Sequence, residues 1–99
     1  MKSVIQTEKV CYLCGKCQEY GPNRLEEHHI FEGNPDRKNS EKYGLKVYLC
    51  GDKCHRNGRE SAHQCGETMQ QLHEDGQRAF EEHHGSRAEF MRIFGRNYL

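Results

Sequence analysis

The sequence predicts a single small α+β domain. Two observations indicate this class: two short strand-like runs lie in the first half of the chain, and helical periodicity occupies its last third. The chain has 99 residues, and it contains no internal repeat, low-complexity tract or Ser/Gly linker that would divide it. We therefore expect one domain over residues 1–99.

The two strand-like runs flank a polar, basic stretch. Residues 25–31 end in the β-formers Ile30 and Phe31 and are followed by the turn residues of 33–35. Residues 46–50 alternate like a second short strand. We expect the two strands to pair with each other, with one or two helical turns in residues 36–44 between them.

The last third of the chain shows helical patterns. Four apolar residues fall on one helical face, namely Met69, Leu72, Ala79 and Phe80. They predict a helix from about Glu67 to His83, with Gly76 as its weak point. Ser86 and Glu89 match a capping box and predict a second short helix. Its core-facing residues are Phe90, Ile93 and Phe94, and Gly95 ends it.

The composition favours a bound metal ion over a large apolar core. Only 33% of the residues are hydrophobic, 30% are charged, and there is no Trp. The first residues contain no apolar run of signal-peptide length, and no stretch approaches membrane-spanning length. We therefore expect a cytoplasmic protein with no membrane partner. In that reducing compartment, paired cysteines bind metal more often than each other.

Two cysteine pairs predict a structural zinc site. Cys11 and Cys14 are separated by two residues, and Cys50 and Cys54 by three, which suits tetrahedral Zn²⁺ held by two chain segments. Because Cys17 also follows Cys14 by two residues, it is an alternative to Cys11. We expect Cys17 and Cys65 to be spare thiols. Buried free or disulfide-bonded cysteines remain the alternative to a zinc site.

Seven histidines form the second notable group. His28 and His29 are adjacent on a predicted strand, so one can bind a metal while the other accepts a proton from water. His55 and His63 follow the second cysteine pair. Together with His28 they would leave open positions on a divalent ion, as a catalytic site requires. The others are expected to be surface or hydrogen-bonded residues: His73, His83 and His84.

Positive charge is concentrated in the middle of the chain. Seven basic residues lie between Arg37 and Arg59, against two acids. From Glu60 to Leu99 the balance reverses, with seven acids and four bases. The basic stretch is either a phosphate-binding surface or a solvated face.

Four segments together resemble the HNH endonucleases of the ββα-metal class, most of all the short zinc-binding HNH proteins of phages and prophages. These segments are residues 11–15, 25–31, 43–50 and 54–63. The resemblance covers nearly the whole chain. It implies a small ββα-metal domain with a structural zinc knuckle and C-terminal helices. The metal-binding core would span about residues 8–66 and the helical segment about 67–95.

The resemblance also implies metal-dependent hydrolysis of DNA phosphodiester bonds. By it, His28 is a metal ligand, His29 is the general base that activates water, and His55 and His63 are further ligands. The ion would be Mg²⁺, Mn²⁺, Ni²⁺ or Zn²⁺, in addition to the structural Zn²⁺. Its implied partners are DNA and phage packaging proteins. The expected phosphate contacts are Arg37, Lys38, Arg56 and Arg59.

The chain departs from the family pattern at two places. Residues 43–45 stand where the middle Asn of the family precedes the second strand, and Asn39 or Asn57 could replace it. The spacing of Cys50 and Cys54 exceeds the commoner two residues, so the register of His55 is open by one position. The missing Asn favours an alternative, a non-catalytic zinc module that binds nucleic acid or a phage protein. A purely structural or assembly protein is the other alternative.

Overall fold

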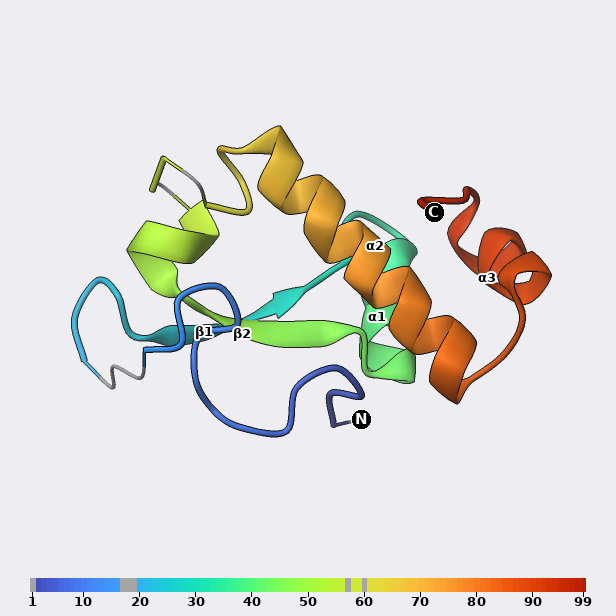
Figure 1. The fold of residues 1–99 in the computed structure, drawn as a ribbon, viewed down its shortest axis with the longest axis horizontal. Coiled ribbons are helices and arrows are strands. Elements are labelled where there is room, and N and C mark those ends of the chain that lie inside the picture. The colour runs from blue at the N-terminus through green and yellow to red at the C-terminus, as the bar shows by residue number, and fades with distance from the viewer. Residues whose placement is uncertain (1, 17–19, 57, 60) are drawn as a thin grey trace.

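The computed structural model describes residues 2–16, 20–56, 58–59 and 61–99. Figure 1 shows the two strands side by side, the long helix α2 crossing beside them, and α3 at the opposite end from η1. The radius of gyration is 13.1 Å, as expected for a compact domain of this length. The elements in chain order are β1 (Leu25–His29), α1 (Asp36–Tyr43), β2 (Lys46–Cys50), the π-helical turn η1 (Gly51–Arg56), α2 (Gly66–His83) and α3 (Arg87–Phe94). The α+β class is confirmed.

The two strands form an antiparallel sheet joined by a helix. Pairing runs from Leu25 opposite Cys50 to His29 opposite Lys46. The connection contains the whole of α1, which confirms the expected helical turns between the strands. Gly44 ends α1 with φ of 70°, a left-handed conformation that glycine adopts without strain. The residues at the position of the missing Asn therefore form a helix C-cap.

The first strand is two residues shorter than predicted. It ends at His29, and Ile30 makes a last backbone hydrogen bond, donating its N–H to the Leu45 carbonyl at 3.0 Å. Beyond Ile30, the segment that precedes β2 belongs to helix α1, so it offers no strand with which β1 could continue to pair. Ile30 and Phe31 instead enter the core, where they are 0% and 1% exposed.

The N-terminal segment covers the outer edge of β2. Ser3 Oγ donates to the Lys46 carbonyl at 2.6 Å. Tyr48 donates its N–H to Gln6 Oε1 at 2.8 Å, and its carbonyl accepts from Tyr12 N–H at 2.8 Å. These contacts satisfy the backbone groups of a strand edge that would otherwise be open to another chain.

Helices α2 and α3 carry the largest apolar side chains and confirm the predicted helical segment. The Ser86–Glu89 capping box is present, and Gly95 ends α3 in the left-handed conformation. Met69 and Ile93 are only partly buried. The rings of Phe90 and Phe94 stack with their centroids 4.7 Å apart. The rings packed with them belong to Phe31, Phe80 and Tyr98.

Gly76 allows α2 to approach the end of β1 closely. A Cβ atom at this position would lie 2.8 Å from Ile30 Cγ2 and 2.9 Å from Phe31 Cε2. The predicted weak point of the helix is therefore a contact that only glycine permits without movement of its neighbours.

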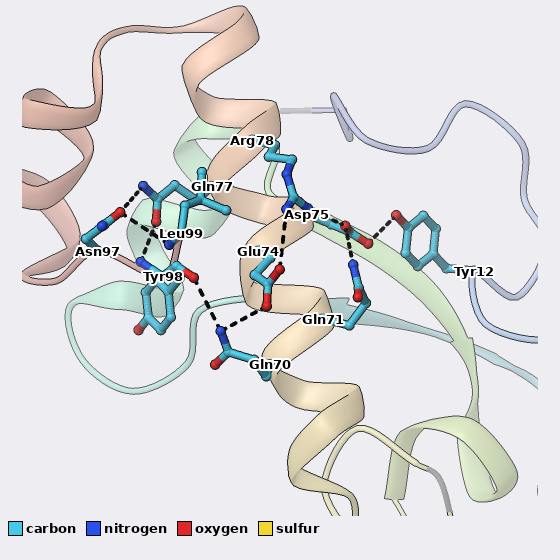
Figure 2. Close-up of polar contacts among 10 residues, drawn as sticks. All are labelled: Tyr12, Gln70, Gln71, Glu74, Asp75, Gln77, Arg78, Asn97, Tyr98 and Leu99. Carbon is cyan, nitrogen blue, oxygen red and sulfur yellow. Dashed lines mark hydrogen bonds and ion pairs between the residues drawn. The ribbon is translucent and has the colours of Figure 1, made fainter.

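The polar face of α2 ties distant segments together, as Figure 2 shows. Tyr12 Oη, beside the first cysteine pair, donates to Asp75 Oδ2 at 2.8 Å. Further along the helix, the buried Gln77 donates from Nε2 to Asn97 Oδ1 at 2.7 Å and accepts from Tyr98 N–H at 2.7 Å. Helix α2 thus anchors both the cysteine segment and the C-terminal tail.

Candidate metal centres

Four cysteines from three segments converge. Cys11 and Cys14 come from a turn near the N-terminus, Cys50 ends β2, and Cys54 lies in η1. Their sulfur atoms all lie within 4.8 Å of one another, and Cys14 Sγ is 3.4 Å from Cys50 Sγ. Four sulfurs on a tetrahedral zinc ion are about 3.8 Å apart, from a Zn–S distance of about 2.3 Å. The cluster could therefore hold a structural metal ion.

The pKa values of the cysteines differ within the cluster. Burial of the Cys11 thiol acts to raise its pKa. Hydrogen bonds from the backbone N–H groups of Cys14 and Cys50, whose nitrogens lie 3.5 Å and 3.4 Å from the Cys11 sulfur, act in the opposite direction. The hydrogen bonds outweigh burial, and the pKa of Cys11 is lowered to about 7. Burial, with contacts to the other cysteines, raises the pKa of Cys50 to about 11 and raises that of Cys54. The protein therefore favours the thiolate form of Cys11, whereas Cys50 and Cys54 would lose their protons only on binding a cation.

Of the two remaining cysteines, the structure describes only Cys65. The described cysteines are free, so none forms a disulfide with another described cysteine. Cys65 is half-buried just before α2 and is not part of the cluster. Cys17, the alternative to Cys11, lies outside the described residues.

His28 is a buried imidazole whose ring nitrogens have no hydrogen-bond partner. The residue is 1% exposed, and among the residues that the structure describes none forms a hydrogen bond with its Nδ1 or Nε2. Burial, reinforced by His55 and His63, lowers its pKa to about 3, so the ring is neutral. Buried polar atoms in proteins are nearly always paired, and a neutral imidazole keeps one nitrogen lone pair that could coordinate a metal ion.

The other two predicted ligands lie beside His28. The ring centroids of His55 and His63 are 5.0 Å and 5.6 Å from that of His28, and 4.8 Å from each other. The three-residue spacing before Cys54 does not turn His55 away, because η1 winds as a π-helix and accommodates the longer spacing. The structure therefore brings the three histidines together.

Glu32 joins these histidines, although the sequence did not single it out. Its Oε1 lies 3.6 Å from His28 Nδ1 and 3.4 Å from His63 Nε2. One ligand atom from each of the four residues falls within a 4.8 Å group. The sequence does place this carboxylate four residues after His28, just beyond the strand. Whether it reaches the histidines, however, depends on the turn at Gly33, which the spacing alone does not predict.

A second carboxylate orients one of the ligands. His55 Nδ1 lies 2.9 Å from Glu26 Oε1, on β1. A histidine ligand commonly gives one ring N–H to such a partner, which fixes the ring and leaves the other nitrogen for the metal. The contact with Glu26 would therefore leave Nε2 of His55 available to coordinate a metal ion.

His29 points to the other face of the sheet, as expected for the neighbour of His28 on a strand. Its Nε2 lies 3.0 Å from Glu41 Oε1, on α1. Both histidines nevertheless line one cleft of about 300 Å³. The residues that line this cleft are Glu27, His28, His29, Glu32, Gly33, Arg37, His55 and His63.

The predicted phosphate contacts are distributed unequally around this cleft. Arg37 lines it, and Lys38 is exposed on α1. Arg59 lines a separate hollow of about 480 Å³ beside Cys14 and Cys54. The Arg56 side chain lies outside the described part of the structure, as does Asn57, one of the two possible replacements for the missing Asn. The other, Asn39, is half-buried on α1.

Comparisons of the chain with protein-family models, curated proteins and solved structures found no match. In the part of the chain that the structure describes, every helix is too short or too polar to cross a membrane. Function is therefore inferred from the geometry of the site.

Proposed function

We propose that the protein is a metal-dependent endonuclease of the ββα-metal type that hydrolyses DNA phosphodiester bonds. The observation that carries the proposal is the buried His28, whose two unpartnered nitrogens face His55, His63 and Glu32 in an open cleft. The resemblance to HNH endonucleases supports the same assignment.

The donor set fits a divalent ion. His28, His55 and His63 would supply nitrogen, and Glu32 would supply oxygen. Three imidazoles favour Ni²⁺ or Zn²⁺ over Mg²⁺, which prefers oxygen ligands. When bound, such an ion supplies Lewis-acid activation of the phosphate and positive charge near the leaving 3′ oxygen. The four cysteines would hold a separate structural Zn²⁺.

The protein's own residues would accept the proton of the attacking water and bind the DNA phosphates. His29 removes a proton from a water molecule, and the water oxygen forms a bond to phosphorus while the bond to the 3′ oxygen breaks. Solvent protonates the leaving 3′ oxygen, and the products carry a 5′ phosphate and a 3′ hydroxyl. Arg37 on the cleft wall contacts the DNA backbone and contributes affinity without base selectivity.

Plasmid nicking tests this proposal. We expect cleavage with Ni²⁺, Mn²⁺ or Mg²⁺, and a loss of about 10²- to 10⁴-fold in rate for His29→Ala, the range for a general base. His83→Ala is the matched control, because His83 is exposed near the C-terminal end of α2. Cleavage that persists unchanged in His29→Ala would remove the base assignment.

A non-catalytic nucleic-acid-binding module is the second candidate, favoured by the absence of the family's middle Asn from residues 43–45. It predicts no cleavage with any divalent metal, together with DNA binding that weakens steeply as salt rises. Salt-independent binding would instead indicate that the basic residues from Arg37 to Arg59 are a solvated face.

A further inference from the structure

The Glu41 carboxylate contacts His29 and Lys46, so that side chains from three elements meet beside His29. Glu41 of α1 places Oε1 3.0 Å from His29 Nε2 on β1. Lys46 of β2, directly opposite His29 in the sheet, places Nζ 2.8 Å from Glu41 Oε2 and 3.1 Å from Oε1. The Lys46 side chain is only 12% exposed and also contacts Glu27 at 3.2 Å. The contact between Glu41 and His29 is therefore set by the fold.

The same contacts determine which His29 nitrogen carries hydrogen. Hydrogen bonds from Lys46 and then from His29 hold the pKa of Glu41 well below its ordinary value, so its carboxylate is ionised. An ionised carboxylate can only accept, so Nε2 of His29 must be the donor. A neutral imidazole has a single N–H, which leaves the lone pair on Nδ1.

We propose that Glu41 is the positioning residue of His29: it holds the imidazole as the Nε2–H tautomer and leaves Nδ1 to accept the proton of the attacking water. The catalytic meaning of this pair rests on the proposed function, but the tautomer itself does not. A carboxylate behind a histidine base is a recurring arrangement, in which it fixes the ring and stabilises the imidazolium that forms. Glu41 would thus supply the orientation expected from the missing Asn.

A third cation site is the competing explanation for this group of residues. Glu27, His29 and Glu41 bring their ligand atoms within 4.8 Å of one another. Lys46, however, already places its ammonium group against both carboxylates, so the positive charge is supplied by the protein. A metal ion there would have to displace a half-buried lysine.

Nuclear magnetic resonance of the zinc-loaded protein tests the tautomer without any cleavage assay. Long-range ¹H–¹⁵N correlations should show His29 as a single Nε2–H tautomer, while the exposed His83 serves as the internal reference for an averaged ring. Glu41→Ala should lose the fixed tautomer, and Glu41→Gln, whose side-chain carbonyl still accepts, should keep it. A mixed or Nδ1–H tautomer in the wild type, or an unchanged one in Glu41→Ala, would overturn the inference.

Kinetics test the positioning role. Glu41→Ala should lower kcat about 10- to 100-fold with little change in KM, the range seen when a supporting partner is removed, and Glu41→Gln should recover most of the loss. Glu74→Ala, which removes a surface partner of Arg78 on α2, is the matched control. Equal losses in Glu41→Ala and Glu41→Gln would refute the positioning role. A fixed tautomer in a wild type that cleaves nothing would support the pairing and refute the proposed nuclease.

Discussion

Two regions of this molecule bury different kinds of side chain. In the cysteine–histidine region, residues 11–65, three cysteines and His28 lie buried at the candidate metal centres, beside apolar side chains such as Leu45, Val47 and Leu49. In the aromatic region, residues 66–99, the buried side chains are mainly Phe80, Phe90 and Phe94, packed ring against ring. We therefore expect a bound metal ion to add to apolar burial in the first region, whereas apolar burial alone would stabilise the second.

The two regions are nevertheless joined. Phe31, at the end of the first strand, packs in the aromatic cluster, and Tyr12 is hydrogen-bonded to Asp75 of α2. Loss of the cysteine–histidine region would therefore remove part of the core of the aromatic region. Altering the metal ligands and the aromatic core one at a time would separate the contributions of metal binding and apolar burial to the free energy of unfolding.

Removal of the structural ion should have the largest effect. A strong chelator, or Cys11→Ser, should abolish the cooperative thermal transition, because structural zinc contributes about 10–16 kcal/mol in small zinc domains. That contribution is comparable to the whole stability of a typical domain, about 5–15 kcal/mol. Circular dichroism on heating measures it, with Cys65→Ser as control. A chelated sample that keeps its transition would show that the aromatic region suffices.

A core truncation in the aromatic region should come next. Phe90→Ala should lower the free energy of unfolding by about 3–5 kcal/mol, the usual result for a fully buried Phe. Urea denaturation measures this, and zinc content measured in the folded state should not change. The neighbouring Met91→Ala, at a side chain 43% exposed, should stay within about 0.5 kcal/mol. Zinc loss from folded Phe90→Ala would mean that the regions are not separable.

The contact between the regions should give the smallest effect. Gly76→Ala should destabilise by about 1–3 kcal/mol, since the new Cβ would press on Ile30 and Phe31. This outweighs the gain in helix propensity of about 1 kcal/mol. Gly66→Ala, whose Cβ would meet nothing within 4 Å, should be neutral or slightly stabilising by denaturation. A more stable Gly76→Ala would mean that α2 and β1 separate easily.

Sequence reasoning was most successful where the signal is local. The capping box at Ser86, the helix over residues 66–83 and the second strand all depend on residues close in the chain, and the structure confirms them. Cysteine spacing is also a local signal, and the four expected sulfurs converge. The first strand was predicted two residues too long because its β-formers are buried by the core and not by the sheet.

Carboxylates were the residues that sequence reasoning missed. Glu26, Glu32 and Glu41 each contact a histidine, at separations in the chain that range from 4 to 29 residues. An exposed glutamate and a glutamate beside an imidazole look alike in a polar sequence, and only the tertiary fold separates them. His73, expected to be a surface or hydrogen-bonded residue, has a hydrogen bond with the Ile30 backbone and also stacks on Phe31, with ring centroids 5.3 Å apart.

The turn η1 has a consequence for how this chain tolerates changes of length. A π-helical turn holds more residues than an α-helical one, so Cys54 and His55 can both reach their clusters from a segment that begins directly after Cys50. Deleting one residue from 51–53 would shorten the segment that links Cys50 to Cys54 and His55, and would change the position of both side chains. Insertions and deletions here would therefore act on both centres at once, whereas substitutions at the same positions would leave the spacing between the centres intact.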